Sequence, residues 1–154
     1  MAKYFPAAKS VAWITPDHLL EQWIPVTDYH DPFPYPYDPA KDPDGYTTAL
    51  PTDKLSFINP PFGNLPLVAQ LIENNSEAKI VLVCPARPQR KYYQQFLKTA
   101  DYLVNVPNCV QFIDKLKVTK NPASKYCPFP ISVMYFNCEP LNAKAVKYNV
   151  VEFC

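Results

Sequence analysis

The residues whose types and spacing best suit chemistry are Asn59-Pro60-Pro61-Phe62, which follow the short apolar run Leu55-Ser56-Phe57-Ile58. Two successive prolines remove two backbone N–H donors and restrict the backbone, so the turn is stiff and its carbonyl groups face outward. The Asn59 carboxamide oxygen and the Pro60 carbonyl offer two acceptors for the two hydrogens of an exocyclic amino group. Phe62 adds a flat ring for stacking. The turn therefore predicts a pocket for an aminated base; the alternative is a proline-rich strand end with Phe62 in the core.

Composition sets the outer limits of what the chain is. Of its 154 residues, 48% are apolar and 19% are charged, which is typical of a globular protein. The length suits a single domain over residues 1–154, with a core at about 11–138 and a tail at 139–154. The formal net charge of +1 gives no overall attraction to nucleic acid, so a DNA contact requires a local basic patch.

Glycine is scarce, because the chain has only Gly45 and Gly63 beside 19 prolines. Neither a G-x-G-x-x-G loop nor a Walker loop is present, since both need several closely spaced glycines. A nucleotide-like cofactor must therefore be held without a glycine-rich phosphate cradle. A cofactor that lacks phosphates fits this limit better than NAD or ATP.

The metal-binding and targeting signals are weak. The five cysteines are scattered without a C-x-x-C pair, and both histidines, His18 and His30, lie far from them, so we expect no metal site. Buried, reduced thiols in an intracellular protein are the expectation for these cysteines. The N-terminus has no apolar signal region and no stretch approaches a membrane span, which predicts neither secretion nor membrane insertion.

The first part of the chain predicts a helix followed by a long stiff loop. Residues 13–24 contain a helix start in which Thr15 is the N-cap and Pro16 takes the first helical position. At helical spacing, Leu19, Leu20 and Trp23 share one face. Residues 28–53 are crowded with proline, aspartate and tyrosine, and a loop of this length inside a domain is usually functional.

The rest of the chain alternates strands and helices. Strands are expected at 54–58, 79–84, 102–106, 109–113 and 131–137, with helices at 65–75 and 89–100. In the first of these helices, Leu67, Val68, Leu71 and Ile72 are expected to face inward. The order predicts an α/β fold with a mostly parallel sheet and a late antiparallel strand. Ligands bind such sheets at the carboxyl ends of the strands, where Asn59 and the Pro85-Ala86-Arg87 turn are expected.

Five segments, in order, resemble the phage-type (Dam-like) DNA N6-adenine methyltransferases. Trp13-Ile14-Thr15-Pro16 is similar to the W-x-T-P element of that family, and Asp31-Pro32-Phe33-Pro34 resembles its acidic D-P-x-P segment. Phe57-Ile58-Asn59-Pro60-Pro61-Phe62-Gly63 is similar to the catalytic N-P-P-[YF]-G motif. Val81-Leu82-Val83-Cys84-Pro85-Ala86-Arg87 and Tyr126-Cys127-Pro128-Phe129-Pro130 resemble the later L-P-A-R and A-P-F elements. The resemblance covers about residues 11–138.

The resemblance implies a Rossmann-like fold and transfer of a methyl group from S-adenosylmethionine to the adenine amino nitrogen of double-stranded DNA. It assigns the target amine to Asn59, Pro60, Pro61 and Phe62, and the cofactor to Trp13, Thr15, Pro16, Asp31 and Pro32. Arg87, Arg90 and Lys91 are candidate contacts to DNA phosphates. A basic stretch at 114–126 (Lys115, Lys117, Lys120 and Lys125) is expected to face the DNA as well.

Each assignment has a structural alternative. Trp13 also suits the core, Asp31 also suits a turn before proline, Thr15 also suits a helix cap, and Arg87 also suits a solvated helix start. For the whole chain, the alternative is a catalytically inactive methyltransferase fold that serves as a structural or binding component, for example of a virion. A further alternative is a different amino target, such as cytosine or RNA adenine. The alternating tail at 145–154 predicts a strand that pairs with a neighbouring chain.

Overall fold

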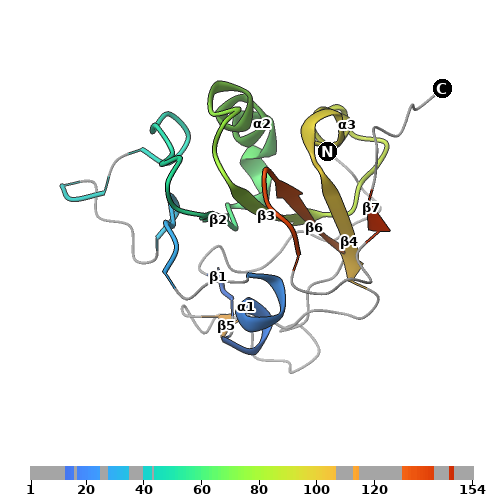
Figure 1. Ribbon diagram of the computed structural model, residues 1–154, viewed down its shortest axis with the longest axis horizontal. Coiled ribbons are helices and arrows are strands. Elements are labelled where there is room, and N and C mark those ends of the chain that lie inside the picture. Colours follow the sequence, from blue (N-terminus) through green and yellow to red (C-terminus); the bar gives the residue numbers. More distant parts are fainter. Residues whose placement is uncertain are drawn as a thin grey trace.

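The central sheet is mixed. The computed structural model describes residues 13–15, 17–24, 28–34, 40–42, 44–106, 113–114, 130–140 and 146–147. Within these residues the sheet has five strands in the order β2-β3-β6-β4-β7 (Figure 1). Their bounds are β2 Ser56–Ile58, β3 Ile80–Pro85, β6 Ile131–Phe136, β4 Tyr102–Val106 and β7 Val146–Lys147. The α/β class is as predicted.

The expectation of a mostly parallel sheet was wrong. Only β2 and β3 pair in parallel, whereas β6 runs antiparallel to both of its neighbours, β3 and β4, and β7 runs antiparallel to β4. The late antiparallel strand is confirmed as β6, which lies between two strands that precede it in the sequence. The apolar runs did not reveal this, because a strand that is buried on both faces has the same composition whichever way its neighbours run.

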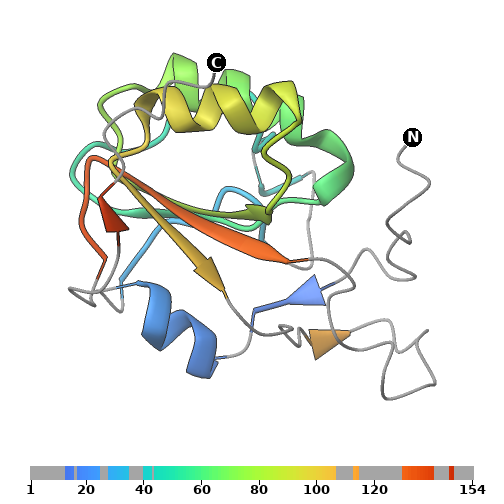
Figure 2. The ribbon, with the colours of Figure 1, turned by 90° about the vertical axis from the view of Figure 1, so that its right-hand side faces the viewer.

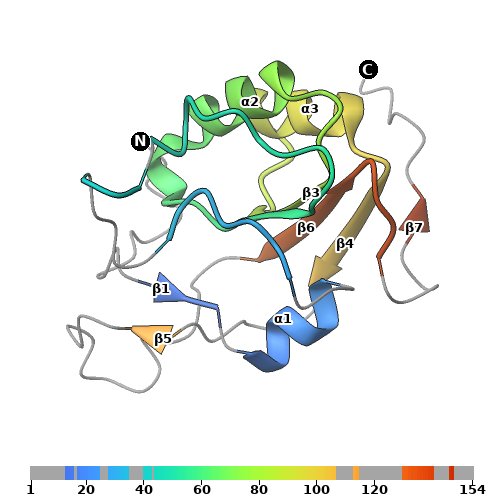
Figure 3. The ribbon, with the colours of Figure 1, turned by 60° about the vertical axis from the view of Figure 1, so that its left-hand side comes forward.

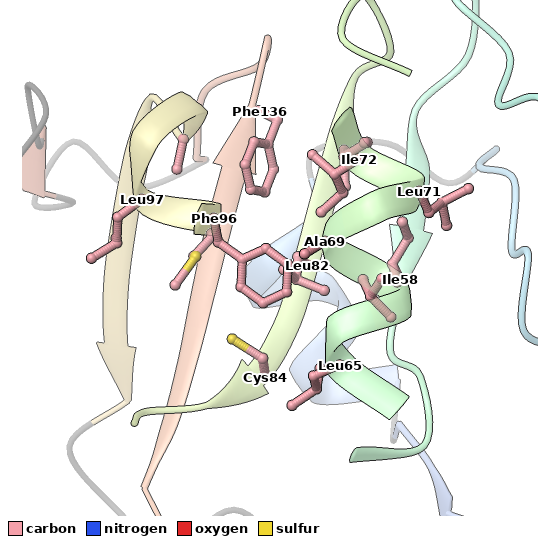
Figure 4. Packing of buried hydrophobic residues seen from close by; sticks show 14 of the residues in the cluster. Ile58, Leu65, Ala69, Leu71, Ile72, Leu82, Cys84, Phe96, Leu97 and Phe136 are labelled. Carbon is pink, nitrogen blue, oxygen red and sulfur yellow. The ribbon is translucent and has the colours of Figure 1, made fainter. Parts of the chain in front are cut away.

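Side-chain alternation along the strands divides the interior into two apolar clusters. Ile80, Leu82 and Cys84 of β3 face one side of the sheet, and Val81 and Val83 face the other. The first side is covered by α2 (Leu65–Asn74) and α3 (Lys91–Thr99), and the second by α1 (Asp17–Trp23) (Figure 2). Figure 4 shows Leu82 and Cys84 on the side of the sheet that carries Phe96 of α3 and Ala69 of α2.

The helix over 65–75 is confirmed with one error in its buried face. Val68, Leu71 and Ile72 are buried as expected, but Leu67 is 51% exposed. Leu65, which is fully buried, takes its place because Leu65, Val68 and Ile72 follow the i, i+3, i+7 spacing of one helix face. The helix expected over 89–100 is α3, whose buried residues are Tyr93, Phe96 and Leu97.

The helix expected within 13–24 is confirmed as α1. Trp13–Ile14 forms strand β1, which pairs antiparallel with β5 (Ile113–Asp114), and α1 starts only at Asp17. The two residues before the expected cap, Trp13 and Ile14, thus pair with a distant segment, which their sequence did not indicate. Pro16 and residues 107–112, where the strand over 109–113 was expected to begin, lie outside the described residues.

The tail strand pairs within its own chain. Val146 and Lys147 of β7 lie opposite Leu103 and Tyr102 of β4, so this strand extends the sheet of the same chain, whereas pairing with a neighbour was expected. The other residues of 141–154 lie outside the described part of the chain. No helix among the described residues is long and apolar enough to cross a membrane.

One buried hydrogen bond ties α1 to the sheet and gives a stability prediction. The Tyr135 hydroxyl donates to the Trp23 carbonyl at 2.7 Å, and burial raises the pKa of Tyr135. Tyr135→Phe leaves that carbonyl without this donor, so the free energy of unfolding in denaturant falls by about 1–3 kcal/mol. Tyr102→Phe, which removes an exposed bond to Glu139, is the matched control and changes stability little. Equal effects of the two substitutions contradict this account.

Candidate functional site

The Asn59 turn lies at the carboxyl end of β2 and leads directly into a helix. Asn59 is half-buried, Pro60 is buried and Pro61 is exposed. The Pro61 carbonyl accepts the Asn64 backbone N–H at 3.3 Å, which opens the 3-10 turn η1 (Phe62–Asn64) before α2. The prolines therefore restrict the path of the backbone from strand to helix. The Pro60 carbonyl accepts no hydrogen bond from a backbone N–H of the described residues.

Phe62 is shared between the core and the surface. Its side chain is half-buried and packs against both apolar clusters of the sheet. The alternative interpretation, in which Phe62 belongs to the core, is therefore confirmed in part. The exposed part of the residue lies at the same end of β2 as Asn59.

Thr15 contacts the Asn59 side chain. The Asn59 Nδ2 group donates to Thr15 Oγ1 at 2.8 Å, across 44 residues of sequence. The alternation of side chains along β2 explains this contact. Ile58 faces α2 and Phe57 faces α1, so the side chain of Asn59 is expected on the α1 side as well. Thr15, which immediately precedes the start of α1, is buried there.

The acidic segment reaches the same end of the sheet along the outer edge of β2. His30 forms a parallel bridge with Ser56: its N–H donates to Leu55 and its carbonyl accepts from Phe57, both at 2.8 Å. Because the bridge is parallel, the chain beyond His30 runs toward the carboxyl end of β2. Figures 1 and 3 show this segment beside β2.

Asp31 forms the turn that its sequence suggested and retains an open carboxylate oxygen. Oδ1 accepts the Phe33 N–H at 2.9 Å, and no hydrogen bond from the described residues reaches Oδ2. The residue is exposed by surface area, yet enough of the chain surrounds its carboxyl that this partial burial raises the pKa of Asp31. The Phe33 N–H and the charge of His30 offset part of that rise.

Two residues that the sequence reasoning did not assign hold the acidic segment in place. The ring of Tyr46 packs edge-on against Phe33 at a centroid distance of 4.9 Å, and its hydroxyl accepts from Asn64 Nδ2 at 3.1 Å. Gly45 lies so close to Pro32 that an added Cβ would collide with its carbonyl oxygen. Tyr46 thereby joins the 31–34 segment to η1. In a chain with only two glycines, the presence of one at position 45 was the sequence feature that could have indicated a close backbone approach there.

The three candidate DNA contacts lie between β3 and α3. Arg87 follows the end of β3 and hydrogen-bonds the Tyr92 hydroxyl, while the Arg90 N–H donates to the Arg87 carbonyl at 2.9 Å. Lys91, the first residue of α3, is exposed. Because β2 and β3 are parallel, this basic turn and Asn59 share the carboxyl edge of the sheet.

Other predicted site features are described only in part. Trp13 lies in β1, but its side chain, like Pro16 and the basic stretch at 115–126, is outside what the structure describes. Among the described residues, no group of three or more His, Cys, Asp or Glu side chains is placed to hold a metal ion. The thiols of Cys84 and Cys138 are free, and burial raises the pKa of both.

The close approach at Gly45 predicts a specific cost of substitution. Gly45→Ala places a methyl group against the Pro32 carbonyl and 2.8 Å from the Phe33 ring, so the 31–34 segment must shift and stability falls by about 1–3 kcal/mol. Gly63→Ala is the matched control, because nothing lies within 4 Å of an added Cβ there. Denaturant unfolding of both variants measures the difference, and a Gly45→Ala protein as stable as Gly63→Ala contradicts the described packing.

The raised pKa of Asp31 predicts a pH-dependent gain on substitution. Ionisation is less favourable in the folded than in the unfolded chain, so the stability contribution of Asp31 is complete below about pH 4 and is lost as pH rises through the folded pKa. Asp31→Asn keeps an oxygen for the Phe33 N–H and removes this loss. We expect a higher melting temperature than wild type at neutral pH but not at about pH 3.

The exposed Asp53 provides the control for that experiment. Asp53→Asn, measured over the same pH series, reports any general effect of removing one negative charge. A difference between Asp31→Asn and wild type that is the same at both pH values contradicts the assignment of the shift to Asp31.

Comparison with known proteins does not identify a family or a relative for this chain. No protein-family model matches the chain, and neither curated proteins nor solved structures give a significant match. The functional argument therefore depends on the residues and contacts of the site.

Proposed function

We propose that the chain is an S-adenosylmethionine-dependent methyltransferase that acts on the exocyclic amino nitrogen of adenine in DNA. The observation that carries the proposal is the meeting of three separate segments at one end of β2. Thr15 hydrogen-bonds Asn59, the His30 bridge sets the acidic segment along the edge of β2, and Tyr46 ties that segment to η1. These are the segments that resemble the entry, cofactor and catalytic elements of the family.

The chemistry proposed for Asn59 follows from the weakness of the nucleophile. The lone pair of an adenine amino nitrogen is delocalised into the ring, so it attacks poorly. Acceptors at Asn59 Oδ1 and the Pro60 carbonyl hold the two amino hydrogens and favour a tetrahedral nitrogen with a localised lone pair. S-adenosylmethionine, when bound, supplies an electrophilic methyl group on a sulfonium sulfur. As the N–C bond forms, the S–CH₃ bond breaks and its electron pair stays on sulfur, which leaves as a neutral thioether. The amino nitrogen, positively charged after the transfer, then loses one proton to water.

The residues of the acidic segment fit that cofactor. Asp31 Oδ2 is an acceptor for hydroxyl or amino donors, and the segment needs no phosphate cradle because S-adenosylmethionine has no phosphates. The partial burial that raises the Asp31 pKa makes its ionised form unfavourable for the fold. A carboxyl group with a pKa raised by burial is typical of functional sites, which supports Asp31 as a ligand-binding group.

The carboxyl edge also supports a DNA partner. Arg90 and Lys91 stand at the start of α3, which has no acidic residue in its first turn. Positive charge at a helix N-terminus is electrostatically unfavourable because it opposes the helix dipole. A bound phosphate would offset this repulsion by interacting favourably with both the basic side chains and the helix N-terminus. The base must leave the stack to reach Asn59, and the exposed part of Phe62 offers a stacking surface that offsets some of the unstacking energy.

A second candidate is an inactive methyltransferase fold with a structural or binding role. The packing of Phe62 against both clusters, and of Phe33 against Tyr46, favours it, because these aromatic rings take up space against the core close to the end of β2. The two candidates make opposite predictions for cofactor binding.

Methyl transfer from labelled S-adenosylmethionine to unmethylated double-stranded DNA tests the proposal. Wild type is expected to label adenine, and Asn59→Ala is expected to lower the rate by about 100-fold or more, because one acceptor that stabilises the transition state is lost. Asn74→Ala, an exposed change at the end of α2, is the matched control and retains the wild-type rate.

Calorimetry with S-adenosylmethionine distinguishes the two candidates. The enzyme binds the cofactor in both the wild-type and Asn59→Ala forms, and the substitution leaves the unfolding midpoint close to wild type. A wild-type protein that binds no S-adenosylmethionine contradicts the enzyme and favours the inactive fold. Labelling of cytosine or of RNA in place of DNA adenine corrects the substrate.

A further inference from the structure

We infer that Thr15 is a positioning residue whose hydroxyl holds the Asn59 carboxamide in place, with Nδ2 toward Thr15 and Oδ1 directed away from it toward the target amine. The inference rests on the proposed function and changes the role that the family resemblance gives to Thr15. There Thr15 belongs to the cofactor site; in the structure its hydroxyl contacts the catalytic side chain at 2.8 Å.

The direction of this hydrogen bond carries the argument. Asn59 donates through Nδ2, so Thr15 Oγ1 is the acceptor. A carboxamide is planar and its nitrogen and oxygen point away from each other, so holding Nδ2 also sets the direction of Oδ1. No donor among the described residues reaches Oδ1. The oxygen is thus the end of the group that remains available to a ligand.

Thr15 is itself held firmly. It is buried, and threonine is branched at Cβ, so its χ1 angle is restricted. On its N-terminal side, β1 is paired with β5; on its C-terminal side, α1 is tied to the sheet by the bond from Tyr135 to the Trp23 carbonyl. The acceptor is therefore supported from both directions along the chain.

The orientation matters because the two ends of a carboxamide have opposite hydrogen-bonding character. With Oδ1 toward the target, Asn59 accepts a hydrogen of the amino group. With the group turned by half a rotation, Nδ2 faces the amine and a donor meets a donor. Without the Thr15 hydroxyl, no hydrogen bond from the described residues restrains rotation of the Asn59 carboxamide away from the orientation seen in the structure. The loss of one such bond changes a rate on the order of tenfold.

The experiment compares Thr15→Val, which keeps the shape and removes the hydroxyl, with Thr15→Ser, which keeps the hydroxyl. Thr99→Val, an exposed change at the end of α3, is the matched control. For each protein we would measure kcat and KM for unmethylated DNA, and Kd for S-adenosylmethionine by calorimetry. Thr15→Val is expected to lower kcat on the order of tenfold, to leave the cofactor Kd within about twofold and to be rescued largely by Thr15→Ser.

A second readout follows the Asn59 side chain directly. In spectra of protein labelled with ¹⁵N, the two Nδ2 protons of Asn59 are expected to change shift in Thr15→Val and to return toward wild-type values in Thr15→Ser. Thr99→Val is expected to leave them unchanged. Unaltered Asn59 amide signals in Thr15→Val contradict the positioning role.

The outcomes separate this inference from the proposed function. A wild-type protein that transfers no methyl group overturns the proposed function and the role of Thr15 with it. An active wild type with an unchanged kcat in Thr15→Val overturns the positioning role alone. A weakened cofactor Kd with unchanged kcat returns Thr15 to the cofactor site, and a Thr15→Ser protein as slow as Thr15→Val shows that the hydroxyl is not the group that matters.

Discussion

The hydrogen bond from Asn59 to Thr15 is the interaction on which the candidate site depends. It joins the turn at the end of β2 to a residue shortly before α1, and so connects the Asn59 turn to the N-terminal segment that contains Thr15. Its geometry follows from strand alternation, which sends Asn59 to the α1 face, and from the Tyr135 bond that holds α1 against that face. A change in the packing of α1 is therefore expected to alter the position of the Asn59 side chain.

The sequence predicted the elements of this fold better than their arrangement. The apolar runs of β3 and β6 and the helical spacing of Val68 and Ile72 correspond to the structure, because burial of a strand or helix face is a local property of composition. The insertion of β6 between β3 and β4 was not foreseen, since it depends on contacts between distant segments. The same reason explains why the pairing of β1 with β5 was not foreseen.

For the candidate site, the types of residue in the sequence indicated the candidate groups, but the contacts between those groups could not be predicted. The spacing of Asn59, Pro60 and Phe62 and the acidic turn at Asp31 indicated candidate groups for chemistry. The roles of Tyr46 and Gly45 became apparent only once the 31–34 segment was seen to pack against them. Thr15 was singled out as a cap and cofactor residue, and nothing in its sequence neighbourhood indicates that its partner lies 44 residues away.

The most direct measurement of the central claim is a titration of ¹⁵N-labelled protein with S-adenosylmethionine, followed residue by residue. The account predicts that shift changes concentrate on Thr15, Asp31 and Asn59 at the carboxyl end of β2. It predicts none at the opposite edge, where Asn137 bonds the Ser76 and Ala78 carbonyls. A spectrum that does not change, or changes that gather at that opposite edge, would contradict the claim that this turn is a methyl-transfer site.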